Sequence, residues 1–254
     1  MKKVLFVGAG PGDPELITIK GMKAIKEADV IIYAGSLVNP ALLEYASNTA
    51  KIYNSATMTL EETHEVMSTS AKEDKSVVRL HTGDPSLYGA IEEQMALLDK
   101  EGIEYETIPG VSACFGAAAS LNLEYTLPDI SQSLIITRME GRTKVPPLES
   151  IESFAAHKST MAIYLSAGML GELSKRLIKG GYDKDTKAAI IYKATWPEEK
   201  VCICTIDTLE KTAADNDIHK TALIIVGDVL NKSGYMRSKL YDPEFSTEYR
   251  EASR

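Results

Sequence analysis

Three short glycine-containing segments each follow a run of apolar residues that predicts a β-strand. In chain order they are Gly8–Asp13, His81–Gly89 and Ile108–Ala113. Glycine lets the backbone turn sharply and approach a ligand closely. Open α/β sheets bind ligands at the carboxyl ends of their strands. The shared position of these segments therefore predicts one ligand site built from three strand-to-helix turns.

The first segment, G-A-G-P-G-D, does not fit a dinucleotide-binding fingerprint. Its third glycine comes too early for the G-x-G-x-x-G spacing, and Pro11 lacks an N–H that could donate to a pyrophosphate. The next predicted strand ends at Tyr33-Ala34-Gly35, without an acidic residue to bind a ribose. We therefore do not expect a nicotinamide or flavin nucleotide. A plain tight turn is the structural alternative.

The second segment contains two candidate catalytic residues, His81 and Asp84. His81 could act as a general base, or it could hydrogen-bond a neighbour at the end of its strand. Asp84 before Pro85 is typical of a helix N-cap followed by proline. In the functional alternative, Gly83 brings the backbone against a ligand beside the Asp84 carboxylate. In the third segment, Ser112 can cap a helix.

The cysteine content, the net charge and the pattern of apolar residues argue against several other classes of protein. The cysteines are Cys114, Cys202 and Cys204, a set without a disulfide framework or zinc spacing, so we expect a cytoplasmic protein with no bound metal. A formal net charge of -8 argues against a nucleic-acid partner. The chain enters a predicted strand at once and has no long apolar run, so we expect neither a signal peptide nor a membrane partner.

Short apolar runs alternate with amphipathic stretches, which is typical of an α/β protein. Strands are predicted at residues 4–7, 30–33, 51–53, 77–81, 104–108, 133–137, 161–165, 188–192, 201–205 and 222–226. Helices are predicted after the N-cap Thr18 and at residues 59–71, 90–100, 112–121 and 170–179, with a short one after Asp207. We predict an N-terminal α/β domain (1–121), a linker (122–132), a C-terminal α/β domain (133–232) and a tail (233–254).

Taken together, the motifs G-A-G-P-G-D, G-D-P-S-L-Y-G and I-P-G-V-S resemble those of the tetrapyrrole methylase family in order and spacing. The likeness runs from about Lys2 to Leu230. Two later segments, I-T-R-M-E-G-R-T (136–143) and Y-K-A-T-W-P-E-E-K (192–200), resemble the members that methylate precorrin-4 at C-11. The resemblance implies two α/β domains with S-adenosylmethionine (SAM) in the cleft between them, generally in a homodimer.

The same resemblance places SAM contacts on Pro11, Thr82, Gly83, Asp84, Leu87, Ser112, Ala113, Leu165, Ala194, Thr221 and Ala222. One position departs from the pattern: Gly35 stands where the subgroup often has an acidic residue. A precorrin carries many carboxylates, which arginine and lysine bind well. The substrate-binding candidates are Arg138, Arg142, Lys144 and Lys193, although a solvated loop would also explain the first three.

Methyl transfer from a sulfonium requires alignment of donor and acceptor and exclusion of water, rather than a catalytic triad or metal cluster. The function implied is therefore SAM-dependent C-methylation of precorrin-4, or its cobalt form, at C-11 in cobalamin biosynthesis. Another precorrin or uroporphyrinogen C-methyltransferase of the family is one alternative. A non-catalytic SAM- or tetrapyrrole-binding module is the alternative from a different class.

Overall fold

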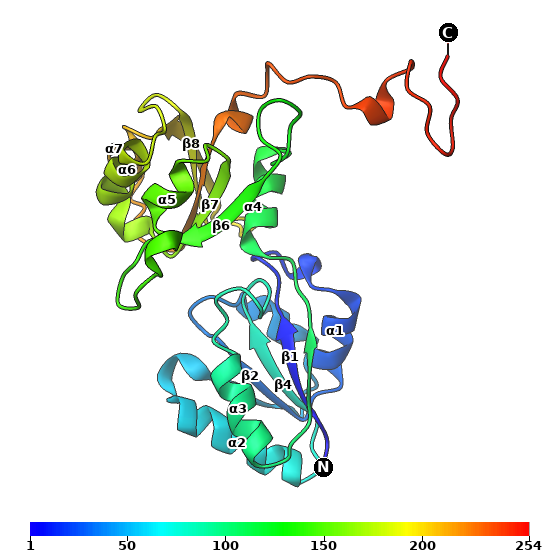
Figure 1. The fold of residues 1–254 in the computed structure, drawn as a ribbon. Helices are drawn as coiled ribbons and strands as arrows, with labels where there is room; N and C mark the ends of the chain where they lie inside the picture. Colours follow the sequence, from blue (N-terminus) through cyan, green and yellow to red (C-terminus); the bar gives the residue numbers. More distant parts are fainter. Residues whose placement is uncertain (254) are drawn as a thin grey trace. The chain divides into compact units, whose positions relative to one another are not determined.

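The computed structural model describes residues 1–253, which form two compact units (Figure 1). The first unit comprises Met1–Ala117 and Lys193–Glu199, and the second comprises Ala118–Tyr192 and the chain from Lys200 onward. The segment 193–199 therefore groups with the first unit, although its place in the sequence lies within the predicted C-terminal domain. The division also falls inside helix α4 (Ala113–Leu121), earlier than the predicted linker.

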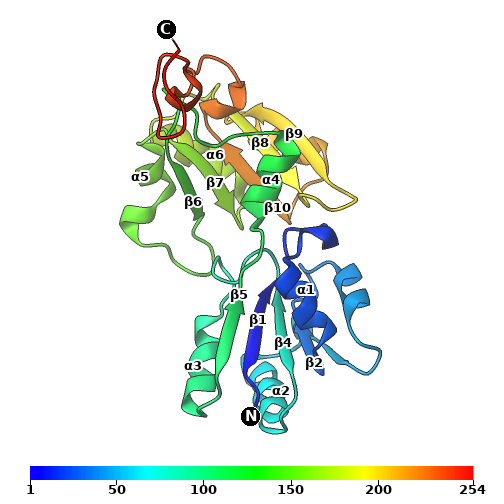
Figure 2. The same ribbon diagram turned by 90° about the vertical axis from the view of Figure 1, so that its right-hand side faces the viewer.

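The first unit contains a five-stranded parallel sheet in the order β3-β2-β4-β1-β5. Its strands are β1 (Val4–Gly8), β2 (Val30–Tyr33), β3 (Lys51–Asn54), β4 (Val77–His81) and β5 (Tyr105–Ile108). Helix α1 (Ile19–Lys26) packs on one face, and α2 (Leu60–Lys72) and α3 (Glu92–Lys100) cover the other (Figure 2). The strand predictions for this half are confirmed to within one residue at each end.

Side chains alternate between the two faces of this sheet, and apolar residues fill both. Val7 and Leu80 belong to the cluster with α1, whereas Val4 and Phe6 belong to the cluster with α2 and α3. Burial on both faces is what a parallel sheet requires. The predicted N-cap of α1 is confirmed, because the Thr18 side chain accepts a hydrogen bond from the N–H of Gly21.

The second unit contains a mixed five-stranded sheet in the order β6-β7-β10-β8-β9. Its strands are β6 (Leu134–Arg138), β7 (Thr160–Tyr164), β8 (Lys187–Tyr192), β9 (Lys200–Thr205) and β10 (Ala222–Val226). Only β6 and β7 pair in parallel; the other neighbours are antiparallel. Helices α5 (Ile151–Ala155), α6 (Leu170–Lys179) and α7 (Leu209–Asp215) contribute to the apolar cluster on one face.

Several local predictions differ from the structure. Asp84 caps no helix, because α3 begins only at Glu92, after two residues with left-handed backbone, Tyr88 (φ 58°) and Ala90 (φ 49°). Helix α5 was not predicted, since its single turn is too short for a periodic pattern. In the tail, Arg250 donates to three backbone carbonyls and orders a short loop. Within residues 1–253, every helix is too short or too polar to cross a bilayer.

Candidate functional site

The three glycine-containing turns leave the same edge of the first sheet. Strand β1 lies between β4 and β5, with Gly8 in register with His81 and Val7 in register with Ile108. Because all three strands are parallel, their carboxyl ends meet at one edge. The structure thus brings the three turns together, as their position after strands predicts.

The turns are bonded to one another through their backbones. Gly10 and Gly83 exchange two hydrogen bonds, with the Gly10 N–H donating at 3.2 Å and the Gly83 N–H donating at 2.8 Å. A Cβ on Gly8 would lie 2.5 Å from the amide nitrogen of Gly110, and a Cβ on Gly110 would overlap the Gly83 carbonyl. Glycine is therefore required at Gly8 and Gly110 by close packing of backbone on backbone.

Asp84 fastens the second turn to the third. One carboxylate oxygen accepts from the Gly110 N–H at 2.8 Å, and the other accepts from the Ser86 N–H at 2.9 Å and the Ser86 hydroxyl at 2.5 Å. Burial alone would raise the pKa of Asp84, but these hydrogen bonds lower it below its ordinary value. The carboxylate is therefore ionised and occupied by donors, which suits a clamp better than a proton acceptor.

His81 is buried, with 4% of its surface exposed, and its ring stacks on Phe6 with centroids 6.0 Å apart. Burial, together with the charge of Arg79 on the same strand, lowers the pKa of His81 to about 3. A base with this pKa is weak at neutral pH. The low pKa disfavours general-base catalysis, and among residues 1–253 the buried Nε2 has no hydrogen-bond partner, so the ring is held by packing rather than by the predicted hydrogen bond.

Gly83 has a left-handed backbone with φ of 60°, and a Cβ built on it would contact the third turn. A Cβ built there would have its nearest neighbours at 3.6 Å, the Ser112 Cα and the Ala113 nitrogen. Ser112 directly precedes α4, and its carbonyl accepts from the N–H groups of Phe115 and Gly116 in the first turn of that helix. These turns present mainly backbone and small residues, which suits the close approach of a small cofactor.

In the second unit, the predicted SAM contacts gather at one edge of the mixed sheet. Leu165 directly follows β7, and Thr221 directly precedes β10. These strands are antiparallel neighbours, with Ile163 opposite Ile224, so both positions lie at the same end of the pair. Ala222 begins β10 opposite Tyr192, the last residue of β8.

Unusual backbone geometry marks these positions. Leu165 (φ 53°) and Thr221 (φ 55°) both have left-handed backbones, and Leu165 is 66% exposed. Ala194 is flanked by left-handed Lys193 (φ 47°) and Thr195 (φ 69°). Such conformations are costly for residues other than glycine, above all for β-branched threonine, and they concentrate at ligand sites. The strain supports a ligand-binding role for Leu165 and Thr221, two of the SAM contacts that the family resemblance implies.

The loop after β6 is organised by Arg138. Its guanidinium donates to the carbonyls of Met139 (3.1 Å), Thr143 (3.2 Å) and Lys144 (3.2 Å), which closes the loop on itself. In addition, the Met139 N–H donates to the Ser166 hydroxyl at 2.9 Å. Arg138 thus holds its own loop together, and it also lines the pocket beside that loop.

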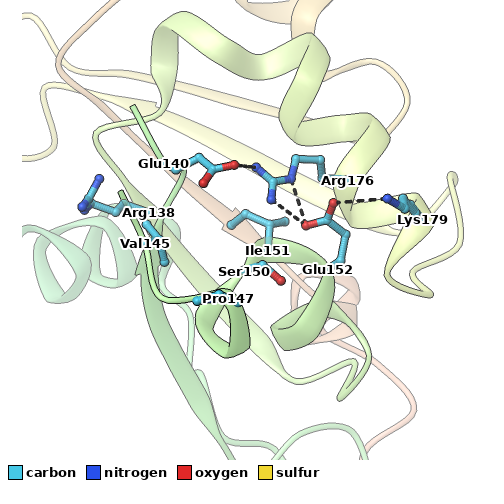
Figure 3. A pocket seen from close by; sticks show the side chains of 9 residues that line it. All are labelled: Arg138, Glu140, Val145, Pro147, Ser150, Ile151, Glu152, Arg176 and Lys179. Atoms are coloured by element: carbon cyan, nitrogen blue, oxygen red, sulfur yellow. Dashed lines mark hydrogen bonds and ion pairs between the residues drawn. The ribbon is translucent and has the colours of Figure 1, made fainter. Parts of the chain in front are cut away.

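A pocket of about 430 Å³ lies beside this loop, and an ion-pair network occupies its wall (Figure 3). Arg176 of α6 pairs with Glu140 at 3.1 Å and with Glu152 at 2.8 Å, and Lys179 lies 3.8 Å from Glu152. Figure 3 shows the Arg138 guanidinium apart from this network. The network anchors the loop to α6 through Glu140.

The remaining substrate-binding candidates differ in their environments. Arg142 and Lys144 are exposed, and within residues 1–253 their side chains make no hydrogen bond or ion pair. Lys193 is engaged, because its ammonium lies 3.5 Å from Glu198 and 5.0 Å from the centroid of the Trp196 ring. Arg142 and Lys144 are therefore the two candidates whose side chains are unpaired within residues 1–253.

The structure also adds residues that the sequence interpretation missed. Asn39 and Trp196 both bond to the first turn, and the only available signal was the single tryptophan of the chain within a family-like segment. At Gly35, a side chain would overlap the amide of Asn54. In this chain, the Asn54 side chain therefore occupies the space that an acidic side chain at position 35 would need.

Comparison with known proteins identifies the family of this chain. The family described as Tetrapyrrole (Corrin/Porphyrin) Methylases matches residues 3–210. This chain belongs to the tetrapyrrole methylase family. It is 57% identical over 251 residues to the cobalt-precorrin-4 C(11)-methyltransferase of Methanocaldococcus jannaschii, which covers 99% of this chain and 97% of that protein.

Two solved structures of the family share the fold. The X-ray structure of a cobalamin biosynthetic enzyme, cobalt precorrin-4 methyltransferase, superposes with a TM-score of 0.88 at 45% identity, covering 90% of this chain and 95% of that one. Uroporphyrin-III C-methyltransferase from Thermus thermophilus, complexed with S-adenosylhomocysteine, superposes with a TM-score of 0.76 at 26% identity, covering 91% and 94%. The predicted family and α/β fold class are confirmed.

Proposed function

We propose that this protein transfers a methyl group from SAM to C-11 of precorrin-4 or cobalt-precorrin-4 during corrin ring biosynthesis. The observation that carries the proposal is the set of interlocked turns after β1, β4 and β5, within a chain 57% identical to an enzyme named for this reaction. The structural relative bound to S-adenosylhomocysteine supports SAM as the methyl donor.

The residues present fit SAM. In the first unit, Pro11, Thr82–Asp84, Leu87 and Ser112–Ala113 would hold it, on turns whose shape is fixed by glycines that let backbone pack closely on backbone. Ala194, Leu165 and Thr221–Ala222 would supply further contacts. Left-handed backbone at or beside these positions supports a shape set for a ligand rather than for packing alone.

SAM supplies an electrophilic methyl group on a sulfonium, so the protein needs no metal or covalent nucleophile to activate the donor. The task of the chain is then orientation of the acceptor carbon and exclusion of water. The interlocked turns provide rigid backbone for that purpose. Asp84 contributes by fixing the Gly110 turn, and His81 contributes as a neutral packing residue under the site.

The substrate contributes many carboxylates, and the loop after β6 offers charges that match them. Arg142 and Lys144 would bind acetate or propionate groups, since both side chains are exposed and unpaired within the described chain. Arg138, which holds three loop carbonyls, would act by positioning these two residues. Lys193 would contribute less, because it is engaged with Glu198.

The proposal is tested by incubating the protein with SAM and, separately, precorrin-4, cobalt-precorrin-4 and uroporphyrinogen III. Mass spectrometry should detect addition of one methyl group to precorrin-4 or its cobalt form only. Methylation of uroporphyrinogen III alone would favour the sibling activity. Binding of SAM and tetrapyrrole without turnover of any substrate would favour the non-catalytic module.

We further propose that the protein is a cytoplasmic homodimer, as the family resemblance implies. Its acidic composition argues against a nucleic-acid partner, and we expect no membrane partner. Sedimentation at micromolar concentration should give twice the chain mass of 27.7 kDa. A single species at the monomer mass would contradict the dimer without affecting the assigned chemistry.

A further inference from the structure

The segment Lys193–Glu199, here called the clip, bonds directly to the first glycine-containing turn. The indole N–H of Trp196 donates to the Pro11 carbonyl at 3.0 Å, and the Asp13 N–H donates to the Thr195 hydroxyl at 3.0 Å. Two backbone groups of the turn thus depend on two adjacent side chains of the clip. A turn with few internal hydrogen bonds gains a fixed shape from such external partners.

Gly12 is shaped to the clip as well. A Cβ on Gly12 would overlap the Trp196 ring, whose atoms are its three nearest neighbours. The Gly12 carbonyl accepts a hydrogen bond from the side-chain amide of Asn39 at 2.8 Å. Glycine is needed here because the indole lies against the backbone, although Gly12 itself does not have a left-handed conformation.

The clip holds a strained conformation through its own contacts. Thr195 has a φ of 69°, and its N–H donates to the Glu199 carboxylate at 2.5 Å. The Glu199 N–H donates to the Trp196 carbonyl at 3.0 Å, and the Lys193 ammonium lies 5.0 Å from the centroid of the indole ring. A left-handed threonine persists only where its surroundings impose it, and such sites are commonly functional.

Core packing does not account for Trp196, because the residue is only half-buried and its N–H is directed to a carbonyl of the turn. The clip also contains Ala194, a SAM contact implied by the family resemblance. Fixing the indole therefore fixes both Pro11 and Ala194, on two segments far apart in the sequence. We propose that Trp196 is a positioning residue for SAM, acting through Gly12 and Pro11; the inference rests on the proposed function.

A double-mutant cycle tests this role. Calorimetry should first establish the Kd of the wild-type protein for S-adenosylhomocysteine. Gly12→Ala should weaken that binding by about tenfold or more, because the new methyl group displaces the indole or the turn. Trp196→Ala should also weaken it. The Gly12→Ala/Trp196→Ala protein should bind no more weakly than Trp196→Ala alone, since the overlap is then absent.

Trp196→Phe provides a variant that keeps an apolar ring and therefore preserves the fold. It lacks the N–H that donates to Pro11, so we expect binding of S-adenosylhomocysteine to weaken by roughly fivefold, the value of one ordinary hydrogen bond. The KM for SAM should rise with little change in the KM for the tetrapyrrole. The matched control is Tyr249→Ala, which removes an aromatic side chain that is 95% exposed and should leave both constants unchanged.

The outcomes separate the two proposals. Failure of the wild-type protein to bind either SAM or S-adenosylhomocysteine would overturn the proposed function and the role of Trp196 with it. Tight binding by the wild type and equally tight binding by Trp196→Phe and Trp196→Ala would overturn only the positioning role. Effects of Gly12→Ala and Trp196→Ala that multiply in the double variant would also overturn it, because Gly12 would then act independently of the indole.

Discussion

Two regions with proposed binding roles are built in different ways. The turns after β1, β4 and β5 are made of backbone: Gly8, Gly83 and Gly110 pack on one another, and Gly10 and Gly83 exchange two hydrogen bonds. The loop after β6 is made of charged side chains, with Arg138 and Glu140 anchoring it and Arg142 and Lys144 left exposed. One region fixes a shape, and the other presents charge.

The difference matches the ligands proposed for each region. A compact cofactor of constant structure is recognised well by a rigid backbone, whose geometry no side-chain rotation can disturb. A large substrate with many carboxylates needs cations on long side chains, which can adapt to it. We therefore expect substitutions in the turns to affect fold and cofactor binding, and substitutions of exposed loop cations to affect substrate binding alone.

The largest expected effect is on the stability of the fold. It should appear when a glycine packed against other backbone is replaced, and not when a glycine in open space is replaced. Gly110→Ala would place a methyl group against backbone atoms of Gly8 and Gly83, so the free energy of unfolding should fall by about 3 kcal/mol or more. Gly141→Ala in the loop after β6 is the matched control, since its Cβ would meet nothing within 4 Å. Chemical denaturation of both variants measures the difference; equal stabilities would mean that the turns are not close-packed.

A second prediction concerns the acid stability of the first unit. The pKa of His81 is about 3 in the folded protein, whereas an unfolded histidine titrates near pH 6.5. The unfolded chain therefore binds the additional proton in this window, so the free energy of unfolding falls as the pH falls. Between pH 6.5 and pH 4 this group alone should remove roughly 3 kcal/mol.

Denaturation of the wild type and His81→Gln across that pH range isolates the contribution of the histidine. As the pH falls, the free energy of unfolding of the variant should decrease less steeply than that of the wild type, whatever its value at pH 7. Parallel curves would show that His81 titrates normally and is accessible to protons. For the same reason, the wild-type kcat/KM should show no ionisation of His81 above pH 5, contrary to a general-base role.

The Asp84→Asn variant tests whether the Asp84 carboxylate holds the turn after β4 to the turn after β5. An amide has one acceptor oxygen in place of two, so it cannot keep the bonds to both Gly110 and Ser86. We expect SAM binding to weaken by about 1–3 kcal/mol, because the third turn loses its anchor. Calorimetry measures this change; unaltered SAM affinity in the folded variant would remove Asp84 from the site.

The smallest effects should come from the exposed cations of the loop after β6. Arg142→Ala and Lys144→Ala should each weaken tetrapyrrole binding by about 1–2 kcal/mol and leave SAM affinity and thermal stability unchanged. Arg138→Ala should weaken tetrapyrrole binding too, but with increased proteolysis of the loop, since three carbonyls lose their donor. Equal losses of both ligands in Arg142→Ala would contradict the separation of the two regions.

The same contrast explains what the sequence could predict. Buried strands such as Val30–Tyr33 and Val77–His81 were located because apolar runs bounded by polar turns leave few alternatives. The three turns were recognised because glycine at a strand end has few explanations other than backbone geometry. A site made of backbone is therefore visible in sequence, once its strands are correctly placed.

Side-chain partnerships were not predictable in this way. Asp84 looked like a helix cap, but left-handed Tyr88 and Ala90 delay α3, and the carboxylate bonds to Gly110, 26 residues away. For Arg138, local patterns predicted a ligand for carboxylates but gave no sign that its guanidinium also donates to three carbonyls of its own loop. Trp196 lies 185 residues from Pro11, a separation that local patterns do not span.

Product analysis with labelled SAM tests the central claim most directly. The protein is incubated with precorrin-4 or cobalt-precorrin-4 and SAM carrying ¹³C in its methyl group, and the product is examined by NMR. We predict a single labelled methyl group attached to C-11 of the macrocycle, and no label in reactions without the protein. A labelled methyl group at any other ring carbon would contradict the assignment, and so would the absence of label from a protein shown to bind both ligands.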